Sequence, residues 1–216
     1  MSNDFVVELD SILENRINEL SEQMKGNANK DVKIPAMKNL LMAALKNEWE
    51  TTLLTSHWVI DEVDCDFRIS LARLAGDEAK HFALIEERLQ SLDGTINNEE
   101  LNKRSPLFHY LMKQKTTFDR AVTGPYAREA LAVARNQVFL EHCKDLKDLK
   151  TIELYNKIQT DEAHHHQLGR NFLASTINSK LDLEKAKTKV LEVLSVVDEI
   201  QEMVIMKMGI CRLPGC

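Results

Sequence analysis

The feature that most constrains this chain is a short motif, Glu-x-x-His, which occurs twice in segments of helical periodicity. The copies are Glu78-Ala-Lys-His81 and Glu162-Ala-His-His165. Residues three positions apart lie on one face of a helix, so each Glu and its His can reach the same point. When successive residues are placed about 100° apart around the helix axis, both motifs fall in stripes of apolar residues. Because a buried carboxylate or imidazole is costly unless paired or metal-bound, the motifs predict a metal centre inside a helical bundle.

The three consecutive histidines of the second motif face different directions. Counting from Glu162, His165 lies at the edge of the apolar stripe, whereas His164 faces away from it. His165 is therefore the predicted ligand, and His164 is a predicted surface residue. His166 also lies near the stripe, where we expect a core histidine that is bonded to a neighbour.

The remainder of the chain fits an all-α fold. Hydrophobic residues make up 44% of 216 residues, and the few glycines (7) and prolines (4) collect between periodic segments. We predict a single domain over residues 1–216, with a bundle over about 35–178 and flanking helices at about 4–25 and 181–208. The bundle helices are expected at about 35–63, 66–92, 124–144 and 148–178, with a long, partly helical crossover over 97–117.

Two residues mark the starts of predicted helices. Pro35 suits the first turn of the first bundle helix, because proline lacks the N–H that would be left unpaired there. Asp148 is the predicted N-cap of the helix that carries the second motif.

Charge and cysteine usage argue against several other classes of protein. A formal net charge of −6 disfavours a generally basic surface for nucleic acid. No apolar run approaches the roughly 20 residues of a membrane span, and Met1–Asp10 lacks the features of a signal peptide, so we expect a cytoplasmic protein without a membrane partner. Cys65, Cys143, Cys211 and Cys216 form no Cys-x-x-Cys pair, which predicts free thiols.

A symmetric two-ion centre needs one more carboxylate from the helix that precedes each motif. In the first half, Glu48 and Glu50 compete for this role. Glu48 aligns with the apolar positions Leu41 and Leu45, whereas Glu50 aligns with polar positions. Glu48 also precedes Glu78 with the predicted turn midway between them, as two antiparallel helices require. Glu48 is the predicted ligand.

The second half offers Glu129 and Glu141, which both flank the buried face of their helix. Orientation does not separate them, but position along the helix favours Glu129, because a turn at about 145–148 places it level with Glu162. Glu141 would then lie near the helix end, on the order of 15 Å away at 1.5 Å per residue. A turn near Thr151 would reverse the choice, so both stay open and Glu129 is preferred.

Taken together, Glu48, Glu78-x-x-His81, Glu129 and Glu162-x-x-His165 resemble the ligand set of the ferritin-like diiron carboxylate proteins. The segments 72–82 and 161–165 are also similar to parts of the tRNA isopentenyladenosine hydroxylases and related ferritin-like proteins, although Val133 stands where those hydroxylases are expected to carry a glutamate. The resemblance implies a ferritin-like four-helix bundle with two iron ions, or one manganese and one iron ion. It implies that Glu78 and Glu162 bridge the ions and that Glu48 and Glu129 are terminal ligands.

The function implied by this resemblance is an oxygen-dependent dimetal oxidase or oxygenase. Dioxygen would be the co-substrate and a small organic molecule the substrate, with an external electron donor and a homodimer as expected partners. A tRNA-modifying hydroxylase is the first alternative, supported by the local similarity and disfavoured by the net charge. A ferroxidase or iron storage protein is the second.

Overall fold

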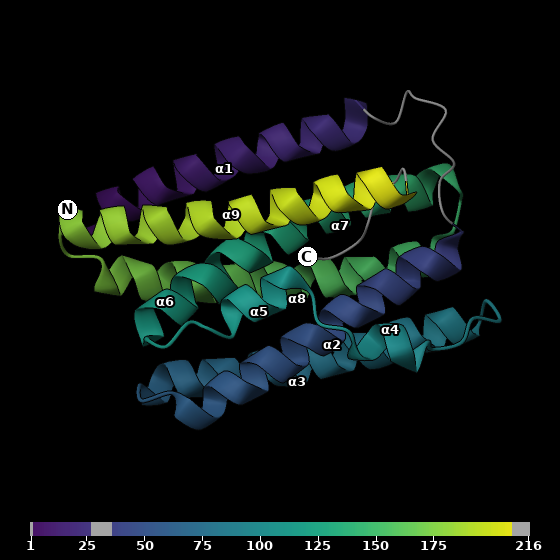
Figure 1. Cartoon of the computed structure of the whole chain (residues 1–216), viewed down its shortest axis with the longest axis horizontal. Coiled ribbons are helices and arrows are strands. Elements are labelled where there is room, and N and C mark those ends of the chain that lie inside the picture. The colour runs from purple at the N-terminus through teal and green to yellow at the C-terminus, as the bar shows by residue number, and fades with distance from the viewer. Residues whose placement is uncertain (1, 27–35, 209–216) are drawn as a thin grey trace.

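The computed structural model describes residues 2–26 and 36–208. The described segments contain helices and no strand, which confirms the predicted all-α class (Figure 1). Pro35, Cys211 and Cys216 lie outside the described residues. No described helix combines the length and apolarity needed to cross a membrane. The elements in chain order are α1 (Ser2–Gly26), α2 (Met37–Asp61), α3 (Cys65–Gln90), α4 (Asn98–Asn102), α5 (Pro106–Leu111), α6 (Thr117–Ala121), η2 (Val122–Arg128), α7 (Glu129–Asp145), α8 (Leu149–Thr176) and α9 (Lys180–Met208).

Two helical hairpins, α2–α3 and α7–α8, form the bundle, and α7–α8 lies between α2–α3 and the flanking helices α1 and α9 (Figure 1). The predicted cap Asp148 begins α8 and accepts a hydrogen bond from the backbone N–H of Thr151. The hairpins meet where α3 and α8 run antiparallel. Near the end of α3, Arg88 donates to Asp148 at 2.8 Å. Near its start, Phe67 packs on Phe172 with 4.9 Å between ring centroids. This register sets opposite one another the two helix segments that carry the motifs.

The apolar core forms two clusters with a polar layer between them. On α2, Leu41 and Leu45 belong to one cluster, Leu54 and Trp58 belong to the other, and Glu48 lies between the two pairs. The motif glutamates of α3 and α8 are likewise flanked by both clusters along their helices. Polar side chains in this layer are therefore cut off from water by packed apolar groups on both sides.

The helices predicted at about 4–25 and 181–208 are present as α1 and α9. They pack against each other, and α1 also contacts α7 and α8, on the side away from α2 and α3 (Figure 1). Val6 and Leu9 of α1 are fully buried in this contact. An ion pair between Arg16 of α1 and Asp198 of α9 fastens the two flanking helices together.

The crossover between the hairpins contains the short helices α4, α5 and α6, as the partly helical expectation for 97–117 anticipates. Glu50 holds it to α2, because its carboxylate accepts from the backbone N–H of Ser105 at 2.7 Å and from the Ser105 hydroxyl at 2.5 Å. Glu50 is buried although it aligns with polar positions of its helix: only 7% of the residue is exposed. The crossover covers it, a path that helix periodicity cannot reveal.

The largest departure from the predicted helices lies before α7. The sequence predicts a helix that begins at Gly124, but the chain is helical throughout α6, the π-helical segment η2 and α7. Pro125 lies inside η2 and has no N–H to donate, which favours a widened turn over ordinary α-helical bonding. Gly169 of α8 faces this segment, and a Cβ atom there would lie 2.5 Å from the backbone nitrogen of Tyr126. Only glycine permits this close approach.

Candidate metal centre

The polar layer brings the six predicted ligands together. Two sets of side chains each have ligand atoms that all lie within 4.8 Å of one another. Glu78 and Glu162 belong to both sets, so the two sets overlap. The first set is Glu48, Glu78, His81 and Glu162, and the second is Glu78, Glu129, Glu162 and His165.

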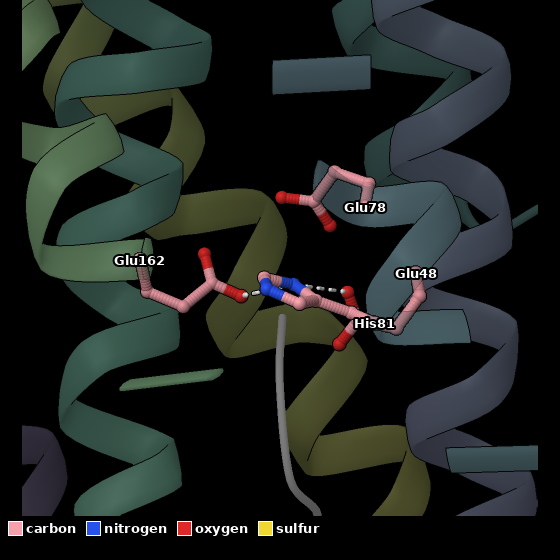
Figure 2. A group of neighbouring side chains, drawn as sticks. All are labelled: Glu48, Glu78, His81 and Glu162. Atoms are coloured by element: carbon pink, nitrogen blue, oxygen red, sulfur yellow. Dashed lines mark ion pairs between the residues drawn. The ribbon is translucent and has the colours of Figure 1, made fainter. Parts of the chain in front are cut away.

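In the first set, the imidazole of His81 lies between two carboxylates (Figure 2). Its Nδ1 atom is 3.5 Å from Oε2 of Glu48 and 3.9 Å from Oε1 of Glu162. Glu48 comes from the middle of α2, His81 from α3 and Glu162 from α8. With Glu78, which is also on α3, three helices therefore direct four ligand atoms toward a common point.

The second set has the same form on the other side of the shared carboxylates. Nδ1 of His165 is 3.5 Å from Oε1 of Glu78 and 3.7 Å from Oε2 of Glu162. Glu129, the first residue of α7, completes this set. The two imidazole rings face the layer from opposite motifs, with 6.4 Å between their centroids.

Each motif histidine is held on its outer side by an aspartate of the opposite motif. Nε2 of His81 is 3.1 Å from Oδ2 of Asp161, and Nε2 of His165 is 3.3 Å from Oδ2 of Asp77. A carboxylate at Nε2 favours the neutral tautomer that carries its proton there, which is the form in which Nδ1 can bind a metal ion. The same pairing of histidine with an outer carboxylate orients ligands in metal sites.

Asp77 and Asp161 are functional candidates that the sequence argument missed. The signal was present, because both motifs have the longer form Asp-Glu-Ala-x-His. Their role depends on the antiparallel register of α3 and α8, in which each aspartate reaches the histidine of the other helix. A comparison of the two motifs could have found the repeat, but not the crossed partnership.

The structure also separates the two carboxylates that orientation left open. The chain between α7 and α8 turns at 146–148, close to the expected position, and Glu129 joins the polar layer. Glu141 lies three turns further along α7 and is exposed. His164 is exposed as predicted, and His166 is bonded to the carbonyl oxygen of Tyr126 at 2.8 Å.

All six predicted ligands are buried, with none more than 4% exposed. Several of their polar atoms have no hydrogen-bond partner among the described residues, although buried polar atoms are nearly always paired. These atoms are suited to bind cations. They are Oε2 of Glu48, both carboxylate oxygens of Glu78, Oε2 of Glu129, Oε2 of Glu162, and Nδ1 of His81 and His165.

The crowding of carboxylates shifts their proton affinities. Burial, reinforced by the charges of neighbouring glutamates, raises the pKa of Glu48 and of Glu78 from 4.5 to about 8. Burial is also the main reason that the pKa of Glu129 rises to about 8. Burial by itself lowers the pKa of His165, but its contacts with Glu162 and Glu78 raise it to about 11. Without a metal ion, the centre therefore holds protons in place of cations.

One buried cation already lies beside the second set. Nη1 of Arg128 donates to Oε1 of Glu129 at 2.6 Å, and Nη2 donates to the Thr51 hydroxyl. Arg128 is the last residue of the π-helical segment, and Glu129 follows it directly. This ion pair occupies one oxygen of Glu129 and leaves Oε2 directed to the remaining ligands.

The donor set fits a pair of divalent transition-metal ions. Carboxylate oxygen together with imidazole nitrogen suits iron and manganese. Four glutamates can balance the charge of two divalent ions, and the two shared glutamates can bridge them. The unpaired ligand atoms described above are the observation that supports this fit.

A family described as "Protein of unknown function (DUF455)" matches residues 11–197, which include all six predicted ligands. The chain belongs to this DUF455 family. No curated protein and no solved structure matches it. For this DUF455 member, the function is therefore inferred from the geometry and chemistry of the polar layer.

Proposed function

We propose that this DUF455 protein is an oxygen-dependent dimetal oxidoreductase that acts on a small organic molecule. The observation that carries the proposal is the pair of overlapping ligand sets, which share Glu78 and Glu162. A single-ion site has no need of a second histidine and a fourth glutamate in the same buried layer. The arrangement of two hairpins, each with a Glu on its first helix and Glu-x-x-His on its second, supports the ferritin-like resemblance.

Each side chain has a distinct part in this proposal. Glu78 and Glu162 would bridge the ions, while Glu48 and Glu129 would bind one ion each. His81 and His165 would each bind one ion through Nδ1, with Asp161 and Asp77 fixing their rings from outside. Two iron ions, or one manganese and one iron ion, would supply the electrons that reduce dioxygen. The apolar clusters on both sides would keep water from the reacting atoms.

The first test is metal stoichiometry in a matched pair of variants. Metal-free protein is equilibrated with Mn(II), and separately with Fe(II) without oxygen, and the bound metal is measured by elemental analysis. We expect two ions per chain in the unaltered protein and in Glu141→Gln, and loss of one ion in Glu129→Gln. Fewer than two ions in the unaltered protein, or equal losses in both variants, would contradict the proposed centre.

The second test separates oxygen chemistry from iron storage. The Fe(II)-loaded protein is exposed to oxygen while oxygen uptake, bound iron and molecular size are followed. The proposal expects oxygen uptake that ends with two irons per chain in a small oligomer. Accumulation of many irons per chain in a large shell would favour the storage alternative instead.

A further inference from the structure

A groove of about 440 Å³ runs along the outside of the bundle between α1, α7 and α8. Its volume lies in the range of small-molecule sites, which is about 300–1,000 Å³. The floor on α7 consists of small apolar side chains at helical spacing, namely Ala130, Val133, Ala134 and Val138. Ile17 of α1 and Ala163 of α8 form the opposite sides. The packing of α1 on α7 and α8 thus leaves a mainly apolar groove between these helices.

This groove lies directly beside the polar layer. Ala130 follows Glu129 in the chain, and Ala163 follows Glu162. Val133 lies one turn beyond Glu129, on the same face of α7. Along α7 and α8, the lining residues nearest to these two glutamates are Ala130, Val133 and Ala163, with Gln159 and His166 about one turn to either side of Glu162.

The wall of the groove also offers hydrogen-bond acceptors. The Nε2 amide of Gln159 donates to the carbonyl oxygen of Val133 at 2.9 Å, and its Oε1 atom, which is closed off from solvent, has no hydrogen-bond partner among the described residues. Nδ1 of His166 must donate to the carbonyl oxygen of Tyr126, so the neutral ring keeps Nε2 as an acceptor. A ligand that pairs with Nε2 of His166 needs a donor such as a hydroxyl or an ammonium group.

The charges on the groove agree with such a ligand. Glu14 of α1 and Glu141 of α7 line it and are exposed, and no Lys or Arg is among the described residues that line it. Two carboxylates repel an anion and attract a cation. The groove therefore favours neutral or cationic molecules over carboxylates and phosphates.

A second hollow, of about 260 Å³, lies between α3 and α8 and is less suited to reach the ligands. Its inner wall includes Leu71 and Leu74, which are 1% and 2% exposed. Leu74 lies one turn before Glu78, so a full leucine side chain separates this hollow from the nearest glutamate. The α1–α7–α8 groove has Val133, Gln159 and His166 within about one turn of its two glutamates, and the small side chains of Ala130 and Ala163 beside them.

We propose that the α1–α7–α8 groove is the substrate-binding site of the dimetal centre and that it takes a small, mainly apolar alcohol or amine. The statement that the ligand is a substrate rests on the proposed dimetal function. The statement that the groove binds such molecules stands on its lining alone, and the two are tested separately.

The experiment uses three probes of one shape, 4-fluorobenzyl alcohol, 4-fluorobenzylamine and 4-fluorobenzoate, each titrated into the full-length protein and followed by 19F NMR. In metal-free protein, the alcohol and the amine should bind, and benzoate should bind on the order of tenfold more weakly. Methyl signals of 13C-labelled Ala130, Ala134 and Ala163 should shift on titration with the alcohol. Absence of alcohol and amine binding, or equal binding of benzoate, would overturn the proposal.

A pair of alanine variants locates the binding. Ala134→Phe fills the groove and should weaken binding of the alcohol on the order of tenfold or more. Ala72→Phe places the same side chain at an exposed position of α3 and should leave binding unchanged. The alanine methyl shifts give an independent location, so the proposal remains testable if Ala134→Phe fails to fold. Both variants should still bind two Mn(II) ions.

Paramagnetic Mn(II) then tests the link to the metal centre. With Mn(II) bound, the 19F relaxation of the alcohol should increase strongly, and Ala134→Phe should abolish the increase. If the alcohol binds and Mn(II) binds but relaxation is unchanged, the groove is not the substrate site and the proposal fails. If no Mn(II) binds, the dimetal function fails, whereas the alanine shifts still decide whether the groove binds alcohols and amines.

Discussion

The two halves of the polar layer carry the same Asp-Glu-Ala-x-His motif, yet the glutamate that completes each half lies in different surroundings. Glu48 comes from the middle of a regular helix. Near it lies the buried phenol of Tyr155, whose hydroxyl has no hydrogen-bond partner within residues 2–26 and 36–208. The pKa of this phenol is raised well above its usual value by burial and then by the charge of Glu48. Glu129 begins α7 directly after a π-helical segment and is paired with the cation of Arg128.

Because of this difference, we do not expect the repeated motif to produce two equivalent ion sites. In the half that contains Glu129, a bound ion must share the carboxylate with a permanent positive charge that is also buried. In the half that contains Glu48, the charge of Arg128 also favours the ionised carboxylate, but the ion pair described for that carboxylate is with the imidazole of His81 at 3.5 Å. We therefore expect the ion on the His81 side to bind more tightly than the ion on the His165 side.

The largest effect should come from removing what the halves have in common. Glu162→Gln takes a shared carboxylate from both ions, and we expect both affinities to fall on the order of a hundredfold or more, because a ligand matters more than its outer partner. Glu48→Gln should weaken the His81-side ion alone. Mn(II) titration followed by EPR distinguishes an interacting pair from a single ion. Retention of a coupled pair in Glu162→Gln would contradict the bridging role.

The crossed aspartates should produce the next largest effects, each confined to one half. Asp161→Asn removes the outer partner of His81, and Asp77→Asn removes that of His165. Each change should weaken the ion on its own side by about 10- to 100-fold. Stepwise Mn(II) titration with EPR detection would show which step moves. If either variant weakened both steps equally, the crossed pairing would not govern the individual ions.

Replacing Arg128 tests the source of the inequivalence. Arg128→Met frees both oxygens of Glu129 and removes a buried positive charge, so the His165-side ion should tighten on the order of tenfold. The metal-free protein should lose stability, because breaking a buried pair commonly costs about 3–5 kcal/mol. Arg120→Met is the matched control, since Arg120 pairs with Glu62 at 3.0 Å outside the polar layer. It should destabilise the fold in thermal unfolding without changing the titration.

The last prediction concerns the metal-free protein, whose stability should depend on pH. Glu48, Glu78 and Glu129 have pKa values raised to about 8, so between about pH 5 and 8 the folded chain holds protons that the unfolded chain has released. Stability should therefore fall as pH rises, by about 1.4 kcal/mol per pH unit for each such proton. Thermal unfolding across this range would show it, and Mn(II) should reduce the slope. A rise in Tm with pH would refute the protonated centre.

What the sequence could predict depended on features local to one helix. Periodicity identified the inward side chains of both motifs and selected Glu48, because the apolar face of a helix follows from the spacing of apolar residues along that helix alone. The rise per residue and the predicted turn placed Glu129 at the level of Glu162. Neither prediction required knowledge of how distant segments of the chain pack together.

What the sequence did not predict depended on how separate segments are brought together. Glu50 is buried by a crossover whose path no spacing rule describes, and Asp77 reaches a histidine across the α3–α8 contact. The π-helical segment was missed for a different reason. Gly124-Pro125 suits the start of a helix as well as a widened turn within one, and the close packing of Gly169 against Tyr126 favours the second.

The π-helical segment also restricts how the length of this chain can change during evolution. Loss of one residue within Val122–Arg128 would rotate all of α7 by about 100° and move Ala130 into the place of Glu129. The crossover before it lies at the surface and can absorb insertions at little cost. In an alignment of DUF455 proteins, gaps should therefore occur around 97–116 and be absent between 120 and 129. A segment of constant length would then precede the second ion site.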